Sequence, residues 1–255
     1  MKLIIGNTGL VGKTLCETVE FDLFFNSSNI EKFNDIVVDG CDLYLSCLPA
    51  TKWLVNKNLK SDIDNINKLI NILSKKKYSK IILISTIDVY NDSPLMVNED
   101  YSPNMSKLTY GNNRYLFEML VKECLITEDL KIFRLPALFN KHIKKNILYD
   151  LINKNNVDQI NINSSYQWYN LDLLSTDIER YLKNFPNEMV FNLFTEPINT
   201  IDIIKLFDYD EKIFTNSNKK IEYNYTTKYV NNGYITNSKN TIKNIKNFIN
   251  EFISK

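Results

Sequence analysis

The chain has 255 residues, and 44% of them are hydrophobic, which is enough for one large domain or a domain with a smaller appendage. Its 31 basic and 30 acidic residues leave a formal net charge of +1, which argues against a nucleic-acid-binding protein. The single histidine, His142, argues against catalytic sites that pair serine or cysteine with an imidazole, and against histidine-rich zinc sites. The four cysteines form no CxxC pair, so we expect no metal site.

No apolar segment approaches the roughly 18 to 20 residues that a membrane span requires. The apolar run at the N-terminus ends at Gly6, far short of the core of a signal peptide. We therefore expect a soluble cytoplasmic protein with reduced thiols.

Strands and helices are expected to alternate through the first half of the chain. The apolar run Leu3–Ile5 leads into a glycine turn, and a helix is expected over residues 13–19. Further strands are predicted at 21–26, 36–38, 42–48, 80–85 and 131–135, with helices over 61–73, capped by Ser61, and over 110–123. This order predicts an α/β fold, a doubly wound parallel sheet of the Rossmann type.

The second half of the chain is less regular. Helices are expected over residues 143–152, 174–182, 200–207 and 242–253, and a strand over 190–194. We expect a dinucleotide-binding domain over residues 1–140, to which residues 171–207 return. A smaller substrate-binding part would be formed by residues 141–170 and 208–255.

Three glycines at GxxGxxG spacing follow the first strand. Gly6 suits a tight turn, Gly9 a close approach of the backbone to a pyrophosphate, and Gly12 close packing of the helix on the strand. The strand before and the helix after favour a dinucleotide site over a purely structural turn, because the helix N-terminus offers free N–H groups to phosphates. The expected cofactor contacts here are Gly6, Thr8, Gly9, Leu10, Val11 and Gly12.

The end of the second strand bears on the choice between NAD and NADP. An NAD site usually has an acidic residue there, whereas this chain has Asn26, Ser27 and Ser28. Small polar side chains could accept a 2′-phosphate, with Lys32 or Lys52 in reach, and Asp22 lies too early in the strand. The sequence therefore favours NADP over NAD without deciding between them.

Three further motifs follow in order: Ser85-Thr86-Ile87-Asp88-Val89-Tyr90 at the end of the strongest strand, Tyr110 to Glu118 on a helix, and Arg134 to Phe139 on a later strand. With the glycine turn, they resemble the extended short-chain dehydrogenase/reductases that modify nucleotide sugars. The resemblance runs over roughly residues 1 to 210. It implies that Tyr110 is the general acid/base and that Thr86 hydrogen-bonds the reacting oxygen.

The residue four positions after the tyrosine departs from that family. The family has a lysine there, which binds the nicotinamide ribose and stabilises the phenolate, and this chain has Arg114. A cation at i+4 lies on the same helix face and lowers the pKa of a tyrosine, but arginine is planar and fixed in its protonation. We expect Arg114 to replace the lysine. The alternative is that Tyr110 is a helix-start aromatic and that Arg114 pairs with Glu118 at i+4.

Other site residues are expected in loops at the carboxyl ends of strands and in the second half of the chain. Further cofactor contacts are predicted at Leu48, Pro49, Ala50, Ser85, Pro136 and Leu138. Substrate contacts are predicted at Asp88, Val89, Lys145, Asn146, Gln167 and Tyr169, although the aromatic residues near Gln167 could equally belong to the core.

The resemblance implies an NAD(P)-dependent oxidoreductase or epimerase that acts on a nucleotide-linked sugar. Ile87 stands where hexose dehydratases of the family carry an acid, which argues against 4,6-dehydration. A homodimer through the helices at residues 61–73 and 110–122 is also implied. The alternatives are a non-catalytic NAD(P) sensor or scaffold on a retained dehydrogenase fold, and a reductase of a non-nucleotide ketone.

Overall fold

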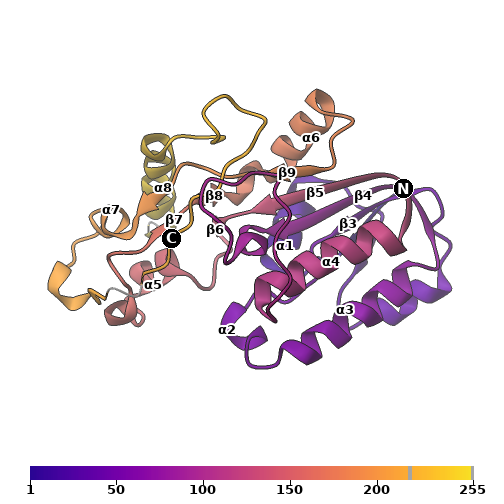
Figure 1. Cartoon of the computed structure of the whole chain (residues 1–255), viewed down its shortest axis with the longest axis horizontal. Coiled ribbons are helices and arrows are strands. Elements are labelled where there is room, and N and C mark those ends of the chain that lie inside the picture. The colour runs from indigo at the N-terminus through magenta and orange to yellow at the C-terminus, as the bar shows by residue number, and fades with distance from the viewer. Residues whose placement is uncertain (218–219, 254–255) are drawn as a thin grey trace. The chain divides into compact units, whose positions relative to one another are not determined.

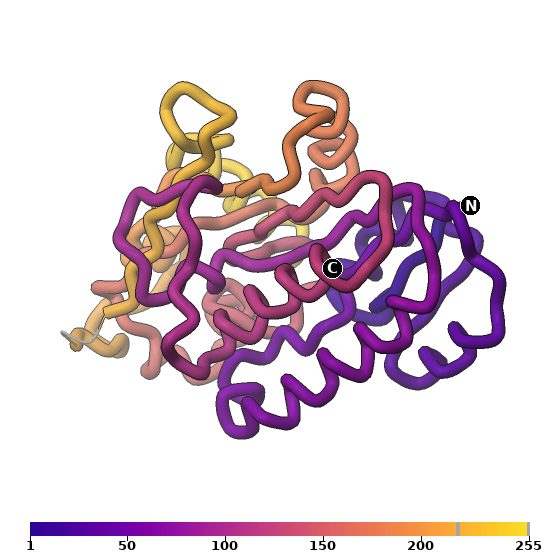
Figure 2. Tube along the Cα trace, turned by 45° about the vertical axis from the view of Figure 1, so that its right-hand side comes forward, coloured from indigo at the N-terminus to yellow at the C-terminus, as the bar shows by residue number. Residues whose placement is uncertain are grey.

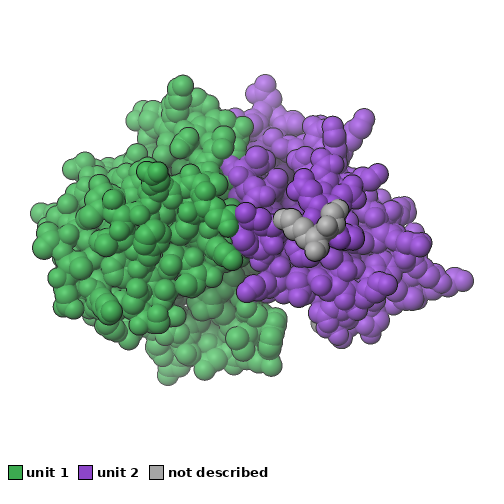
Figure 3. All heavy atoms as spheres, turned by 180° about the vertical axis from the view of Figure 1, so that it is seen from behind, with its two compact units in different colours: residues 1–93, 100–134, 174–192 green, residues 94–99, 135–173, 193–255 purple. Residues whose placement is uncertain are grey.

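The computed structural model describes residues 1–217 and 220–253, and the chain forms two compact units (Figures 1 and 3). Unit 1 comprises residues 1–93, 100–134 and 174–192, and unit 2 comprises residues 94–99, 135–173 and 193–255. The expected division placed residues 94–99, 135–140, 171–173 and 193–207 in the first part, whereas all of them lie in unit 2. Residues 94–99 are held there by backbone hydrogen bonds, from Met96 N–H to the Asn224 carbonyl (2.7 Å) and from Thr226 N–H to the Val97 carbonyl (2.9 Å).

Unit 1 is built on a six-stranded parallel sheet with the strand order β2-β1-β3-β4-β5-β9. The strands are β1 (Lys2–Ile5), β2 (Leu23–Phe25), β3 (Cys41–Leu45), β4 (Lys77–Thr86), β5 (Ile126–Leu135) and β9 (Val190–Asn192). Leu3 on β1 pairs with Leu23 on one side and with Leu43 on the other. The predicted doubly wound parallel sheet is confirmed. The strand expected at residues 36–38 is wrong, because Val37 is 88% exposed and this short apolar run joins no sheet.

Helices cover both faces of this sheet. They are α1 (Leu10–Thr18), α2 (Lys52–Val55), α3 (Leu59–Leu73), α4 (Tyr110–Cys124) and α6 (Leu174–Asn184), with 3-10 turns η1 (Ile30–Asp35) and η2 (Ile87–Tyr90). Helices α3 and α4 lie side by side on one face, and α1 and α6 pack together on the other (Figures 1 and 2). The N-cap of α3 is Asn58, not Ser61, because the Asn58 side chain accepts the N–H of Ser61.

Unit 2 contains two small sheets and three α-helices in its described residues. Its elements are β6 (Ala137–Phe139), α5 (Ile147–Asn153), η3 (Val157–Gln159), β7 (Ser165–Tyr166), β8 (Trp168–Asn170), η4 (Leu171–Leu173), β10 (Ile198–Asn199), α7 (Thr200–Ile204), η5 (Glu211–Ile213) and α8 (Ser238–Ile253). Strands β6 and β8 are parallel, β7 and β10 are antiparallel, and α8 packs on β8. Across the described part of the chain, no helix has both the length and the apolar character needed to cross a bilayer.

Candidate active site

The glycine turn between β1 and α1 has the geometry that its spacing predicts. Gly6 has φ +99°, a backbone conformation that favours glycine, and a Cβ there would overlap the Ser46 carbonyl group. A Cβ on Gly12 would overlap the Gly6 carbonyl oxygen, so this glycine lets α1 pack against the turn. Gly9 differs, because its Cβ would meet nothing closer than 3.5 Å. Packing therefore does not require glycine at position 9, and the missing side chain leaves room for a ligand.

The start of α1 leaves backbone donors available beside Gly9. The first intrahelical bond runs from Lys13 N–H to the Gly9 carbonyl (2.9 Å), so the N–H groups of Leu10, Val11 and Gly12 precede the helical ladder. No acidic side chain lies in the first turn of the helix. Thr8 and Gly9 are exposed. Free N–H groups at the positive end of a helix fit a pyrophosphate, so the residues here fit the predicted dinucleotide.

Alanine at Gly9 and at Gly12 should have opposite consequences. Gly12→Ala is expected to lower the free energy of unfolding by about 1–3 kcal/mol, because the new methyl group overlaps backbone. Gly9→Ala should leave stability within about 0.5 kcal/mol of wild type, because φ at Gly9 is −73° and space is open. It should nevertheless weaken dinucleotide binding about tenfold or more. Urea unfolding and calorimetry measure the two effects. Unchanged affinity in Gly9→Ala would contradict a pyrophosphate at this turn.

The turn after β2 contains small polar residues that bind one another. The Asn26 side-chain oxygen accepts the hydroxyl (2.6 Å) and the N–H (2.9 Å) of Ser28, and the Asn26 amide donates to Asn7 in the glycine turn (3.3 Å). The Asp22 carboxylate accepts the Lys2 N–H (2.7 Å) at the opposite end of β2. Asp22 therefore does not serve as the acidic residue of an NAD site, and the turn that follows β2 carries no acid.

The end of β4 and the start of α4 are brought together in unit 1. Thr86 ends β4, and its hydroxyl oxygen accepts the N–H of Asp88 (3.2 Å) in η2. Helix α4 begins at Tyr110 and packs against η2. This packing depends on Gly111, because a Cβ there would overlap the Asp88 carbonyl oxygen. The two motifs that carry Thr86 and Tyr110 therefore meet at one corner of the sheet.

Arg114 lies over the ring of Tyr110, with the guanidinium carbon 4.5 Å from the ring centroid. Burial raises the pKa of the Tyr110 phenol. The positive charge of Arg114 and a hydrogen bond from its side chain lower this pKa, and the charges of Asp88 and Asp62 raise it. The predicted neighbourhood of tyrosine and cation is therefore present. The alternative pairing of Arg114 with Glu118 is not, because Glu118 pairs with another arginine.

The partner of Arg114 is Asp62 on α3, a site residue that the sequence motifs did not predict. Arg114 donates to both carboxylate oxygens of Asp62 (2.8 and 3.1 Å) and to the Pro49 carbonyl (2.7 Å). Asn113 donates to the same carboxylate (2.8 Å). Arg114 and Asp62 are only 6% and 5% exposed. The sequence pattern does indicate that this carboxylate is buried, because Asp62 lies one helical turn before Ile66, on the apolar face of α3.

One buried donor of Arg114 remains free. Its Nε–H has no hydrogen-bond partner among the residues that the structure describes. Buried donors are rarely left unpaired, because the desolvation cost is about 1–3 kcal/mol. A donor of this kind fits an acceptor supplied by a ligand, such as a ribose hydroxyl. Arg114 therefore fits the cofactor role expected of the i+4 cation.

Lys52 and Asp88 form an ion pair at the same corner of unit 1. Lys52 Nζ lies 2.6 Å from Asp88 Oδ1. Asp88 was predicted to contact substrate, and Lys52 was considered for a 2′-phosphate. The two charges therefore neutralise each other within the protein. Asp88 also accepts a long hydrogen bond from the Thr86 hydroxyl (3.4 Å). The Val89 side chain is fully buried.

Ser85 belongs to a buried polar network behind this corner. Its hydroxyl donates to Glu118 (2.5 Å), which pairs with Arg134 through two oxygens (Nε–Oε1 3.0 Å, Nη2–Oε2 2.5 Å). Arg134 also donates to the Tyr90 hydroxyl (2.5 Å). Each charge is satisfied inside the protein, so this network holds β4, β5, η2 and α4 together. The Ser85 hydroxyl is therefore occupied by Glu118.

The predicted contacts Leu48 and Ala50 lie in unit 1, in the loop before α2, and those in the second half of the chain lie in unit 2. Both amide hydrogens of Gln167 bind backbone carbonyls, of Thr195 (2.5 Å) and Tyr225 (2.8 Å), and Tyr169 is 2% exposed, which favours structural roles for both. Asn146 caps α5 by accepting the Tyr149 N–H (3.0 Å) and donates to the Leu138 carbonyl (2.8 Å). Pro136 connects β5 and β6. Lys145 is partly buried, and burial lowers the pKa of its amine.

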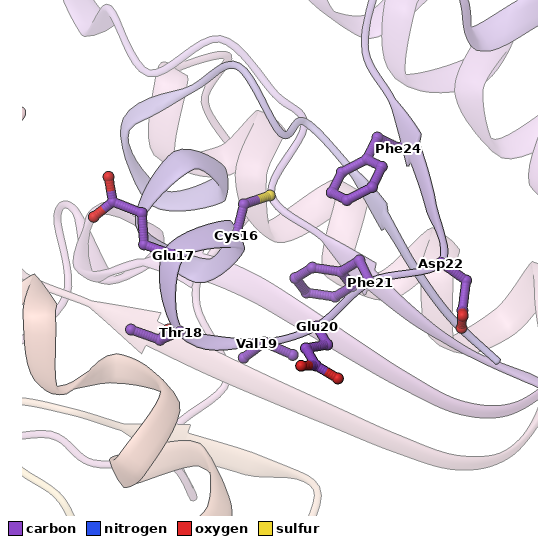
Figure 4. Close-up of a pocket in the computed structure, with 8 residues that line it drawn as sticks. All are labelled: Cys16, Glu17, Thr18, Val19, Glu20, Phe21, Asp22 and Phe24. Carbon is purple, nitrogen blue, oxygen red and sulfur yellow. The ribbon is translucent and has the colours of Figure 1, made fainter.

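A surface pocket in unit 1 lies away from these residues. It is lined by Cys16, Glu17, Thr18, Val19, Glu20, Phe21, Asp22 and Phe24 (Figure 4). The rings of Phe21 and Phe24 make an edge contact with their centroids 6.3 Å apart. The pocket adjoins the C-terminal end of α1, whereas the glycine turn adjoins the N-terminal end. It is therefore not part of the predicted dinucleotide site.

No model of a known protein family matches the chain, and no curated protein is significantly similar to it in sequence. Solved structures do match over the full length. A dTDP-4-dehydrorhamnose reductase from Clostridium acetobutylicum is 15% identical, covers 98% of this chain and 99% of its own, and has a TM-score of 0.71. MoeE5 in complex with UDP-glucose and NAD is 11% identical over 98% of each chain, with a TM-score of 0.70.

A third match is the UDP-glucose 4-epimerase of Thermotoga maritima, in a structure with UDP-glucose. It is 14% identical, covers 99% of this chain and 98% of its own, and has a TM-score of 0.67. These proteins are extended short-chain dehydrogenase/reductases, and at such identities the likeness shows a common fold. The fold predicted from the motifs is therefore confirmed over nearly the whole chain.

Proposed function

We propose that this protein is an NAD(P)-dependent oxidoreductase or epimerase that acts on a nucleotide-linked sugar. The observation that carries the proposal is the placement of Tyr110 at the start of α4, under the Arg114 guanidinium and against the turn that follows Thr86. Similar folds bind NAD together with UDP-glucose in MoeE5, and bind UDP-glucose in an epimerase. These likenesses support a nicotinamide dinucleotide and a sugar nucleotide as the ligands.

The proposed roles follow from the chemistry of each group. The glycine turn and the first N–H groups of α1 hold the pyrophosphate, and Arg114 donates to the nicotinamide ribose. Thr86 orients the reacting oxygen of the sugar, and Tyr110 exchanges its phenolic proton with that oxygen. The bound nicotinamide supplies or accepts the hydride. Unit 1 is the dinucleotide-binding part in this proposal, and unit 2 contributes substrate contacts, with Lys145 suited to a phosphate.

The proposal also covers the choice of dinucleotide, the oligomeric state and the location. NADP is favoured over NAD because the turn after β2 presents Asn26, Ser27 and Ser28 and no acid, although neighbours of similar fold are in complex with NAD. A homodimer through α3 and α4 and a cytoplasmic location complete the proposal.

A thermal-shift panel tests the proposed ligands. The protein is heated with NAD, NADH, NADP or NADPH, each with and without UDP, dTDP or GDP. A ligand at about 100 times its dissociation constant stabilises a protein by about 2.7 kcal/mol, so we expect one dinucleotide to raise Tm and one nucleoside diphosphate to raise it further. A dinucleotide effect alone would favour a sensor or a non-nucleotide substrate. If no dinucleotide raises Tm and none is released on denaturation, the proposal is wrong.

A further inference from the structure

The cation beside Tyr110 is paired with a carboxylate inside the protein. Asp62 receives two hydrogen bonds from the Arg114 guanidinium and a third from the Asn113 amide. A bidentate pair of this kind fixes the plane and position of the guanidinium. Because both partners are almost fully buried, solvent screens little of the interaction between them. Asp62 therefore offsets part of the positive charge that Arg114 presents to the phenol.

The other charged groups near Tyr110 do not make the surroundings of its phenol positive. The charged groups that act on the phenol are Arg114 on α4, Asp88 on η2 and Asp62 on α3. Arg114 lowers the pKa of the phenol through its charge and through a side-chain hydrogen bond, whereas the two carboxylates raise it. Lys52 on α2 is drawn to Asp88 at 2.6 Å. The ring itself is 6% exposed. Burial is the largest of these effects and opposes the phenolate, so the neutral phenol is favoured as long as the attraction of Arg114 for a phenolate is offset.

We propose that Asp62, by pairing with Arg114, offsets the attraction of this cation for a phenolate and so keeps Tyr110 a proton donor. The site then reduces a carbonyl at neutral pH and does not readily oxidise an alcohol. This inference rests on the proposed function and narrows it. It favours a keto-sugar reductase over a 4-epimerase, because epimerisation begins by oxidising a sugar hydroxyl and needs Tyr110 as a base. Asp62 acts through Arg114, so it is a positioning residue.

The reduction is balanced with a reduced nicotinamide dinucleotide as the hydride donor. A hydride forms the new C–H bond at the carbonyl carbon while the C=O π bond breaks. The Tyr110 O–H bond breaks, and its proton goes to the former carbonyl oxygen, which becomes a hydroxyl. The products are the alcohol, the oxidised dinucleotide and a tyrosinate that takes a proton back from water. Arg114 takes no part in this proton transfer, because a guanidinium keeps its proton near neutrality.

Titration of Tyr110 tests the inference without any substrate. The near-ultraviolet absorbance of tyrosinate is followed with pH in the ligand-free protein, and the signal of Tyr110 is the difference between wild type and Tyr110→Phe. We expect Tyr110 in wild type to ionise only above the pKa of about 10 of an ordinary tyrosine, because burial raises its pKa. Ionisation of Tyr110 near neutral pH would overturn the inference. That outcome would leave the proposed function intact, because dinucleotide binding in the thermal-shift panel tests the function separately.

Two variants test whether Asp62 has this role. Asp62→Asn leaves Arg114 without its counter-charge, so the pKa of Tyr110 should fall below that of wild type. The double variant Asp62→Asn, Arg114→Gln removes the cation as well and should not lower this pKa. Asp64→Asn, an exposed site on the same helix, makes the same charge change and should leave the pKa unchanged.

The pKa of Tyr110 in these variants either supports or contradicts the role of Asp62. An unchanged or higher pKa of Tyr110 in a folded Asp62→Asn protein would overturn the role of Asp62. A fall in the double variant as large as in the single variant would also overturn it, because no cation would remain to cause the fall. If Asp62→Asn does not fold, the wild-type titration and the double variant still decide the matter. In that case, a lower pKa in the double variant contradicts the inference.

Discussion

Tyr110→Phe is expected to lower turnover about 10²–10⁴-fold while dinucleotide affinity stays close to that of wild type. The substitution removes a single hydroxyl group. The phenylalanine ring can keep its place under the Arg114 guanidinium, which lies 4.5 Å from the ring centroid. The glycine turn between β1 and α1 is not touched. Turnover is measured with the sugar nucleotide that the thermal-shift panel identifies, and affinity by calorimetry.

A matched control for this variant is Tyr115→Phe on the same helix. Tyr115 lies beside Arg134, with the guanidinium carbon 5.9 Å from its ring centroid, and not beside Arg114. We expect Tyr115→Phe to keep most of its turnover. If Tyr110→Phe turned over substrate at the wild-type rate, Tyr110 would not be the acid/base. If the wild-type protein bound dinucleotide but showed no turnover, it would instead be a sensor or scaffold.

Glu118→Gln is expected to destabilise the fold by about 3–5 kcal/mol, because it leaves Arg134 buried without its counter-charge. Glu118 and Arg134 are 3% and 4% exposed in their side chains, so water cannot replace the lost interaction. The Ser85 hydroxyl would lose a charged acceptor as well. A loss of this size is a large part of the 5–15 kcal/mol that typically stabilises a domain. Urea unfolding followed by circular dichroism measures it.

The control for this prediction is Glu123→Gln, which makes the same change at an exposed position of α4. Its free energy of unfolding should stay within about 0.5 kcal/mol of wild type. Equal stability of Glu118→Gln and Glu123→Gln would mean that the buried network contributes little. A double variant with Glu118→Leu and Arg134→Met should recover part of the stability, since it removes both charges together.

Sequence patterns predicted the elements whose signals are local and repeated. The helices α3 and α4 and the strand β4 were predicted within a few residues of their observed bounds, because their apolar side chains recur at a regular spacing. The prediction of a strand at residues 36–38 was wrong, because a run of three apolar residues does not show whether a neighbouring strand is available to pair with it. The N-cap Asn58 was missed because Ser61, equally suited by type, lies three residues later.

The site was predicted less completely than the fold, because its ion pairs join distant parts of the chain. Arg114 was expected to meet a ligand or Glu118, and its partner Asp62 is 52 residues earlier on another helix. Glu118 likewise pairs with Arg134 on β5. Such pairs depend on which helix packs beside which strand. Local spacing identifies the charged residues but does not choose among their possible partners.

The position of β9 in the sheet affects how the protein folds during synthesis. The chain leaves unit 1 after β5 and returns to it only at residue 174, and β9 pairs with β5 through Phe133 and Phe191, whose rings stack. Until the ribosome has made β9, β5 has an unpaired edge with apolar neighbours, and such edges invite association between chains. This long-range pairing also raises the contact order and slows folding. Truncation before residue 190 would leave that edge permanently open and favour aggregation.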